Sequence, residues 1–401
     1  MKFIINSLLD TDLYKFTMNQ LFLYKHPDLS GEYVFKCRNK GVIFTEEMFE
    51  EIERQVNHLC WLQFTDEELN YLKSIKFLKP NYIEFLRLWH PQREYITMWL
   101  EESGELNIRV KGPLFSAMQF EIYLLEIVNE VYFRKHPFYY YSAIVESARR
   151  KLKENIQAFK DGKYTFKFAE FGCRRRLSQE WEDEVIRTYI ENGITNLVGT
   201  SNVYLAHKYN IKPIGSYAHE AVQCYQGMPN IPLAYGNYYM MEDWYDLYRG
   251  AAGLGTALTD TITTDLFLLD FDKSKASTFD GVRHDSGDPY VWGEKIIKHY
   301  ESLRIDPKTK TLLFSDSLNF EKAQKIYEHF KDRIGVSFGI GTYVSNNTMA
   351  EPLNIVIKLQ YVNGHPVAKL SDSPGKTMCQ DENYVEYLKS AVKFRLNNEM
   401  M

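Results

Sequence analysis

The stretch Gly281-Val282-Arg283-His284-Asp285-Ser286-Gly287-Asp288-Pro289 decides the predicted fold. It starts as an apolar strand, finishes in charged residues and glycines, and precedes a helix that can begin at Pro289. Six more segments between residues 151 and 350 have the same plan. These strands are predicted to end at Glu170-Phe171-Gly172, Val198-Gly199-Thr200, Ser216-Tyr217-Ala218-His219, Leu258-Thr259-Asp260, Phe314-Ser315-Asp316 and Ile340-Gly341-Thr342. Strands that alternate with helices indicate a parallel sheet, and seven in one run favour an irregular, TIM-like parallel α/β barrel over an open sheet.

Helices separate several of these strands and are predicted at 178–191, 201–209 and 319–331, after a long helix at 139–159. In a parallel barrel the carboxyl ends of the strands hold the active site, so polar residues at these ends predict an enzyme. An alternative is that polar residues only mark the start of each loop. This alternative explains any single strand end, but it explains all seven poorly.

Residues 1–150 follow another pattern, in which helical periodicity dominates. A helix is predicted at 12–24, and Thr65 with Glu68 forms a capping box before a short helix. Alternating residues predict two strands, at 32–38 and 106–111.

After residue 350 the pattern is that of a hairpin. Residues 355–359 and 367–370 flank the turn dipeptide Asn363-Gly364. We therefore predict an α+β domain made of residues 1–150 together with 351–401, and a barrel domain at 151–350.

Composition excludes several classes of protein. The chain has 401 residues, of which 45% are hydrophobic, and its net charge of -5 argues against a nucleic-acid partner. The five cysteines are odd in number and never form a C-x-x-C pair, which argues against a disulfide framework and a zinc site. Asn6, Asp10 and Asp12 interrupt any signal peptide, and no run approaches the roughly 18 apolar residues of a membrane span. A cytoplasmic protein without a membrane partner is the expectation.

The segment 281–289 is also the strongest indication of chemistry. It places a cation, a histidine and two carboxylates beside glycines, which allow a ligand to approach the backbone closely. A solvated salt bridge at a strand end is the simpler interpretation, and such a pair contributes little to stability. The density of functional groups favours a site.

This segment resembles the R-x-D-S-G-D-P signature of the nicotinate and nicotinamide phosphoribosyltransferases, the type II members of their class. The resemblance continues in the family's order through nearly the whole chain. It includes Asp10-Thr11-Asp12-Leu13-Tyr14-Lys15, Glu170-Phe171-Gly172-Cys173-Arg174-Arg175, Gly199-Thr200-Ser201-Asn202, Gly215-Ser216-Tyr217-Ala218-His219-Glu220, Ser315-Asp316-Ser317 and Gly339-Ile340-Gly341-Thr342. The shorter, bacterial nicotinate branch is the most similar. The resemblance implies transfer of ribose 5-phosphate from phosphoribosyl pyrophosphate (PRPP) to nicotinate, the first step of NAD salvage from nicotinate, with ATP as a coupled substrate.

His219 matches the family histidine that takes a phosphoryl group from ATP. A histidine after Ser-Tyr-Ala is by itself more often a hydrogen-bonded structural residue, but a neutral imidazole is a competent nucleophile near pH 7. The resemblance therefore implies a phosphohistidine at this position. Glu220 can orient the ring or serve as an exposed helix cap.

Carboxylates are expected at the ribose. Positive charge builds on the sugar as pyrophosphate leaves, and Asp285 is the candidate that stabilises it. Asp288 can hold a sugar hydroxyl or a water of Mg²⁺, the metal that a pyrophosphate leaving group normally brings. The alternative for Asp288 is a cap on the helix that begins at Pro289.

The 5-phosphate needs backbone N–H groups. Two loops at the last predicted strands can supply them, and barrels often bind phosphate there. The candidates are Asp316, Ser317, Gly339, Gly341 and Thr342.

Nicotinate needs aromatic faces and a cation. By resemblance, Phe171 stacks on one face of the ring and Tyr14 on the other, with Tyr14 supplied by the second subunit of a head-to-tail homodimer. Both can equally be core aromatics. Arg283 is predicted to grip the carboxylate with its planar guanidinium. Arg174 is expected to reach the ligand phosphate.

The choice between acid and amide is predicted from Gly199-Thr200-Ser201-Asn202. The nicotinamide branch carries an aspartate at this point, where it accepts a hydrogen bond from the amide. Thr200 and Ser201 are expected at the substrate instead, and the absence of a carboxylate favours nicotinate.

Two other functions are considered. A quinolinate phosphoribosyltransferase also uses PRPP, needs cations for a second carboxylate, and leaves His219 unexplained. Arg174 to Arg176 can be offered as those cations, although Arg175 and Arg176 have no assigned role and can be surface charge. An inert nucleotide-binding barrel is disfavoured by the presence of His219, Asp285 and Asp288 together.

Overall fold

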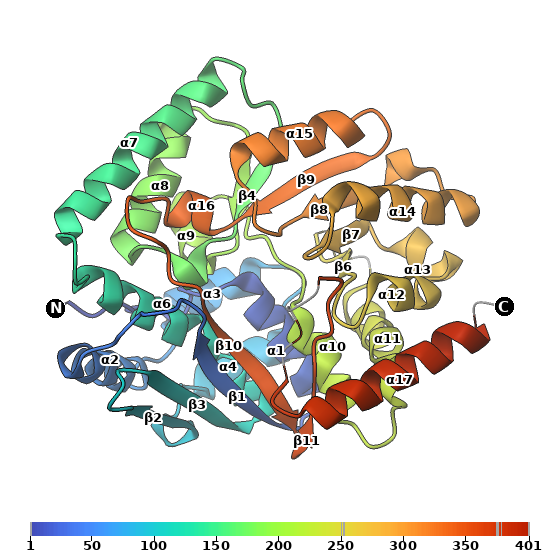
Figure 1. The fold of residues 1–401 in the computed structure, drawn as a ribbon, viewed down its shortest axis with the longest axis horizontal. Coiled ribbons are helices and arrows are strands. Elements are labelled where there is room, and N and C mark those ends of the chain that lie inside the picture. Colours follow the sequence, from blue (N-terminus) through green and yellow to red (C-terminus); the bar gives the residue numbers. More distant parts are fainter. Residues whose placement is uncertain (1, 250, 252, 374–376, 378, 400–401) are drawn as a thin grey trace.

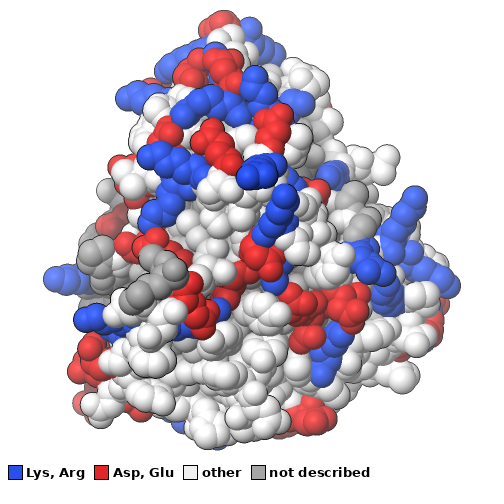
Figure 2. Space-filling model, turned by 90° about the vertical axis from the view of Figure 1, so that its right-hand side faces the viewer, with Lys and Arg blue, Asp and Glu red and all other residues white. Residues whose placement is uncertain are grey.

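The computed structural model describes residues 2–249, 251, 253–373, 377 and 379–399. In this part of the chain the strands form two sheets, which lie in the lower and upper halves of Figure 1. On the face in Figure 2, Lys and Arg side chains are mixed with Asp and Glu side chains. No helix among the described residues is long and apolar enough to cross a bilayer.

The first sheet is antiparallel and has the order β11-β10-β1-β3-β2. Its strands are β1 (Ser30–Cys37), β2 (Ile96–Leu100), β3 (Leu106–Pro113), β10 (Ile355–Val362) and β11 (His365–Pro366). The predicted strands at 32–38 and 106–111 are therefore confirmed. Because β10 pairs with β1, the C-terminal segment joins the sheet of the N-terminal part. The predicted domain boundaries near residues 150 and 350 stay predictions.

Helices of the N-terminal part surround this sheet. They are α1 (Leu13–Lys25), α2 (Glu46–Leu59), α3 (Asp66–Ser74), α4 (Pro80–Leu88), α5 (Leu114–Ala117) and α6 (Phe120–Arg134). The C-terminal helix α17 (Glu382–Glu399) packs instead against α12 (Thr264–Asp270) and the 3₁₀ turn Leu233–Tyr235. The capping box predicted before α3 is present, with Thr65 Oγ1 accepting from the Glu68 N–H and the Glu68 side chain accepting from the Thr65 N–H.

The second sheet is parallel, with the order β5-β4-β9-β8-β7-β6 in the described residues. Its strands are β4 (Phe168–Glu170), β5 (Leu197–Thr200), β6 (Thr256–Leu258), β7 (Gly281–His284), β8 (Thr311–Phe314) and β9 (Gly335–Ile340). Helices connect and cover them. These are α7 (Tyr141–Lys160), α8 (Gln179–Glu191), α9 (Val203–Tyr209), α10 (His219–Gln226), α11 (Gly236–Tyr248), α12 (Thr264–Asp270), α13 (Lys273–Thr278), α14 (Pro289–Ser302), α15 (Phe320–Phe330) and α16 (Thr342–Ser345). An α/β fold with a parallel sheet is thus confirmed.

One of the seven predicted strands, the one expected to end at 216–219, is wrong. Residues 216–218 have no strand, and His219 begins α10. The preceding segment makes one parallel bridge, between Thr200 and Pro213, through backbone hydrogen bonds of Thr200 to Lys212 and Ile214. Pro213 has no N–H to offer a strand on its other side. Side chains then reach β6, because Ser216 Oγ donates to the Thr256 carbonyl. The described strands form a sheet with β5 and β6 at its edges, and the barrel is not confirmed.

The C-terminal hairpin is confirmed at its turn. Asn363 and Gly364 have φ of 50° and 77°, which a tight hairpin turn requires. The second strand of the hairpin, predicted at 367–370, is wrong, however, because β11 spans only His365–Pro366. The chain leaves the hairpin, and the Leu370 N–H donates to the carbonyl of Thr261, in the loop after β6.

An aromatic core joins α7 and α15 to the parallel sheet. Phe320 of α15 is fully buried, and its ring centroid lies 5.1 Å from that of Phe159 and 5.2 Å from that of Phe168. The helices are thereby fixed over the strands that carry the polar ends.

We predict that Phe320→Ala lowers the free energy of unfolding by about 3–5 kcal/mol, because truncating a buried phenylalanine loses apolar burial and leaves a cavity. Urea denaturation measures the change. Phe394→Ala is the control, since Phe394 is exposed on α17. Equal losses for the two variants would contradict the aromatic core.

Candidate functional site

A cavity of about 520 Å³ opens where the strands of the parallel sheet meet β10 and α1. Most of the predicted site residues line it. They are Tyr14, Phe171, Arg174, Ser201, His219, Arg283, Asp285, Asp316, Ser317, Gly339, Gly341 and Thr342. The structure thus brings together residues separated by more than 300 positions, and their individual roles stay predictions.

Thr200 is not on the cavity wall. Its side chain is fully buried, and its Oγ1 donates to Glu170 Oε2 at 2.7 Å and accepts from the Asn202 N–H at 3.1 Å. Thr200 therefore holds the turn after β5, and Ser201, the next residue, faces the cavity.

Asp288 also lies away from the cavity. It is exposed, and its Oδ1 accepts from the N–H groups of Tyr290 at 2.8 Å and Val291 at 3.0 Å. The helix-cap alternative is therefore confirmed, since Asp288 is the N-cap of α14. Its part in holding Mg²⁺ stays a prediction.

His219 lies in a compact polar group. Its Nε2 is 2.9 Å from Asp260 Oδ1, 2.8 Å from Lys369 Nζ and 3.6 Å from Asp285 Oδ2. Lys369 Nζ also lies 2.8 Å from Asp260 Oδ2, to which Ser286 Oγ donates. The first turn of α10, the loop after β6 and the C-terminal segment each contribute a member.

The electrostatics favour a neutral imidazole. Burial, and after it the ammonium of Lys369, lower the pKa of His219 to about 4, against the opposing effect of Asp260. A neutral ring has a single N–H, so Nε2 can donate to Asp260 or accept from Lys369, but not both. In the tautomer that donates to Asp260, the lone pair is on Nδ1.

Arg283 lies in β7 and pairs in register with β8, and Asp285 directly follows the strand. Arg283 Nη2 is 3.4 Å from Asp285 Oδ1, and Arg283 Nε donates to Ser315 Oγ at 2.8 Å. Burial opposes ionisation of Asp285, but Arg283 and other nearby positive charge outweigh it and lower its pKa to about 2. Asp285 is thus a carboxylate at neutral pH.

An aromatic face lies beside this cation. The Arg283 guanidinium is 5.9 Å from the ring centroid of Phe171. A side chain at Gly339 would collide with that ring, so the glycine makes room for it. The Phe171 N–H donates to the Ile340 carbonyl, which ties the ring to the end of β9. This pair can receive a planar ring that carries a carboxylate.

Tyr14 reaches the cavity within its own chain. The N–H of Leu13 donates to the Ser201 carbonyl at 2.8 Å and holds the start of α1 against the turn after β5. A second subunit is therefore not needed to bring a Tyr14 to this cavity. Its supply by a partner stays a prediction.

The sequence interpretation missed several polar residues. Lys369 was placed in a hairpin arm, and no local signal marks it. Asp260 ended a predicted strand and could have been found from that position. The exposed-cap role of Glu220 is wrong, because Glu220 is buried and pairs with Lys15, which also lies 2.7 Å from Glu121.

Two further cations line the cavity and were also missed, namely Arg38 and Lys358. Burial lowers the pKa of Lys358 to about 8. Arg175 lines the cavity too, while its Nε donates to the Ile355 carbonyl at the start of β10. Positive charge therefore gathers at the β10 side, where phosphate oxygens can be neutralised.

The interpretation of Arg176 as surface charge is wrong. Its side chain is fully buried, and its Nη1 lies 2.6 Å from Asp10 Oδ1. It is committed to buried carboxyl partners and cannot face a ligand in the cavity.

Comparison with known proteins gives concordant results. A model of the nicotinate phosphoribosyltransferase (NAPRTase) family matches residues 166–396, and a model of the NAPRTase N-terminal domain matches residues 9–129. The chain is 46% identical to a nicotinate phosphoribosyltransferase of Chromobacterium violaceum, over 97% of each chain. It is 44% identical to one of Neisseria meningitidis serogroup A, over 96% of each chain.

Solved structures agree. The crystal structure of a nicotinate phosphoribosyltransferase from Porphyromonas gingivalis superposes with a TM-score of 0.89 at 36% identity, covering 97% of this chain and 100% of that one. The Vibrio cholerae structure of the same name has a TM-score of 0.90 at 33% identity, covering 99% and 97%.

Substitution of Asp288 distinguishes a role as the N-cap of α14 from a role in holding Mg²⁺. We expect Asp288→Ala to lower the free energy of unfolding by about 0.5–2 kcal/mol, whereas Asp288→Ser keeps a capping hydroxyl and most of the stability. Both variants should need the same Mg²⁺ concentration as the wild type for half-maximal turnover. A large rise in that concentration for Asp288→Ser would show that the carboxylate holds the metal.

Proposed function

The chain belongs to the nicotinate phosphoribosyltransferase family, and from this premise we propose that it couples transfer of ribose 5-phosphate from PRPP to nicotinate with ATP hydrolysis through a phosphorylated His219. The transferase activity is that of the family. The observation that carries the coupling is the group of His219, Asp260 and Lys369 at the cavity.

In the proposed phosphoryl step, neutral His219 donates its Nε2–H to Asp260 and attacks the γ-phosphorus of ATP through Nδ1. A phosphorus–nitrogen bond forms as the bond to the ADP oxygen breaks. The ring gains positive charge, which Asp260 stabilises at 2.9 Å. Lys369 lies on the Nε2 side of the ring, away from Nδ1, and holds the second oxygen of Asp260. Hydrolysis of the phosphohistidine then returns the ring to its starting state.

In the proposed ribosyl step, the nicotinate ring lies on Phe171 and its carboxylate on Arg283. Arg283 Nε is bonded to Ser315 Oγ, and one N–H of Nη2 faces Asp285 Oδ1, so Nη1 and the second N–H of Nη2 are proposed to bind the carboxylate. The ring nitrogen attacks the anomeric carbon as the bond to pyrophosphate breaks. Asp285 is ionised and stabilises the positive charge that develops on the ribose.

The phosphates are assigned by charge and backbone. The 5-phosphate is proposed at Asp316, Ser317 and the 339–342 loop, and Arg174 is proposed to contact a ligand phosphate.

Bound Mg²⁺ would neutralise the leaving pyrophosphate. Asp260 and Asp285 fit a metal, since they offer oxygens within 4.8 Å of one another and of His219, but Lys369 already occupies Asp260. Phosphate oxygens are therefore proposed as the main ligands.

We also propose a homodimer with a shared active site and a cytoplasmic location. The dimer rests on the family resemblance, since Tyr14 already lines the cavity of its own chain. Support for the location is that all five cysteines are free. Of the three arginines offered for quinolinate, Arg176 is unavailable, because it is buried in ion pairs.

His219→Ala should abolish ATP hydrolysis and the gain in nicotinate use that ATP provides, while a slow ATP-independent reaction remains. Labelled ATP should leave an acid-labile phosphate that maps to residue 219 in the wild type. His365→Ala, on the exposed hairpin turn, is the control. ATP stimulation that survives in His219→Ala would reject the phosphohistidine.

The pH dependence follows from the lowered pKa. A histidine with a pKa of about 4 is neutral at pH 6, whereas an ordinary imidazole with a pKa near 6.5 is mostly protonated there. The rate of His219 labelling should therefore stay level from pH 8 down to 6 and be lost only as the pH falls through about 4. A decline centred near pH 6.5 would contradict the buried, neutral ring.

Arg283→Lys should raise the KM for nicotinate about 10- to 100-fold and change the KM for PRPP little, because a hydrogen bond to a charged group contributes about 1.5–3 kcal/mol. The lysine keeps the charge but loses the planar fork. Steady-state kinetics with each substrate varied in turn provides the measurement. Equal increases for both substrates would reassign Arg283 to the phosphates.

A further inference from the structure

A second polar group lies buried behind the cavity wall, around Arg176. Its guanidinium grips Asp10 with two bonds, Nη1 to Oδ1 at 2.6 Å and Nη2 to Oδ2 at 2.8 Å. Nη1 also lies 3.0 Å from Glu182 Oε2 and 3.4 Å from Glu126 Oε1. We call Arg176 and its neighbours Asp10, Glu126, Cys173, Glu182 and Asn202 the Arg176 cluster.

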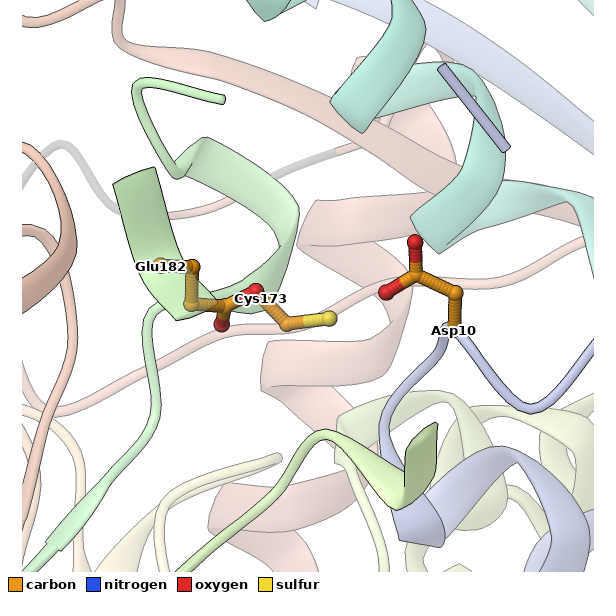
Figure 3. Close-up of side chains that lie close together, drawn as sticks. All are labelled: Asp10, Cys173 and Glu182. Carbon is orange, nitrogen blue, oxygen red and sulfur yellow. The ribbon is translucent and has the colours of Figure 1, made fainter. Parts of the chain in front are cut away.

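Cys173 and Asn202 complete this cluster. The thiol of Cys173 donates to Glu126 Oε1 at 2.7 Å. Asn202 Nδ2 donates to Asp10 Oδ1 at 2.8 Å and to Glu182 Oε2 at 3.0 Å, while its Oδ1 caps α9. Figure 3 shows Asp10 on the N-terminal segment close to Cys173 and Glu182, so the cluster joins parts of the chain that are distant in sequence.

The members of the cluster do not line the cavity, but most are chain neighbours of residues that do. Asp10 precedes Asp12 and Tyr14, and Asn202 follows Ser201. Cys173 and Arg176 flank Arg174 in the turn that begins at Phe171, and Glu126 lies on α6 five residues after Glu121. The cluster is thus the common anchor of one side of the wall.

From this arrangement we infer that Arg176 is a positioning residue, which holds Tyr14, Phe171, Arg174 and Ser201 in place around the nicotinate ring. The inference rests on the proposed nicotinate site. Other segments carry His219, Asp285 and the phosphate loops, namely α10, β7, β8 and β9. Loss of Arg176 should therefore weaken nicotinate recognition selectively.

The charge of the cluster is compatible with burial. One guanidinium faces three carboxyls, and burial raises the pKa of Glu126 well above its usual range and that of Glu182 to about 7. A proton on Glu126 and partial protonation of Glu182 near neutral pH reduce the negative charge around Arg176. A two-bond fork between a guanidinium and a carboxylate fixes both distance and angle, which an apolar contact does not.

The test compares Arg176→Lys with Arg395→Lys in the full-length protein. Arg395 is a matched control, because its guanidinium also donates to a buried carboxylate, Asp270, but lies away from the cavity. We expect Arg176→Lys to raise the KM for nicotinate at least 10-fold and the KM for PRPP by a smaller factor, because Arg174, a proposed phosphate contact, lies in the same turn as Phe171. The ATP labelling of His219 should stay within threefold of wild type. Arg395→Lys should lose stability without this selective change. Glu182→Gln, which mimics the protonated acid, should stay within threefold for all three quantities.

Hydrogen exchange supplies a readout that does not depend on turnover. In Arg176→Lys, amides at 11–14 and 171–175 should exchange faster, whereas those at 283–285 and 315–317 should not. If Arg176→Lys does not fold, Asp10→Asn breaks the same fork and carries the same expectations. Parallel rises of both KM values, or unchanged exchange at 11–14 and 171–175, would overturn the inference. A wild-type protein that cannot use nicotinate would instead overturn the proposed function.

Discussion

Parallel, in-register pairing of the strands is the constraint on which the site depends. Gly281 pairs with Thr311 and Thr311 with Gly335, so β7, β8 and β9 finish at one edge of the sheet. The polar residues that follow each strand must then lie together, whatever their distance in sequence. The aromatic core around Phe320 keeps α7 and α15 packed on these strands and so maintains the alignment of the strand ends.

Compensation of buried charge is the second constraint. Removing an ionised group from water is costly unless a partner of opposite charge replaces the solvent. Lys369 forms an ion pair with Asp260 beside His219, and Lys15 forms one with Glu121 beside Glu220. The effect on His219 is chemical as well as structural, because burial and Lys369 together keep the imidazole unprotonated. A histidine at the surface would be partly protonated near neutral pH.

The C-terminal segment links the two sheets to one cavity. β10 pairs with β1 in the antiparallel sheet and presents Lys358 to the cavity. The chain then turns at Asn363 and Gly364, passes the loop after β6 and brings Lys369 to His219. The N-terminal segment does the same from the opposite end of the sequence, since Asp10 bonds to Arg176 and Tyr14 reaches the cavity.

The sequence by itself determined the features that depend on local pattern. Six of the seven strands predicted between residues 151 and 350, the capping box before α3, the turn at Asn363 and the polar residues at the strand ends follow from hydrophobic periodicity and turn chemistry. Most candidate residues, including His219, were singled out by resemblance to the family's motifs rather than by periodicity.

Only the tertiary structure decided the rest, because it depends on contacts between segments that are distant in the chain. The segment before His219 is no strand, because Pro213 has no N–H to offer a strand on the side away from β5. Lys369 and Asp260 became partners of His219 through the path of the C-terminal segment. Arg176 looked like surface charge beside Arg174 and Arg175, yet a single turn of 3₁₀ helix directs it into the interior. The residues that pack against this turn decide whether each of the three adjacent arginines faces the cavity or the core. The sequence pattern of the turn does not show which residues these are.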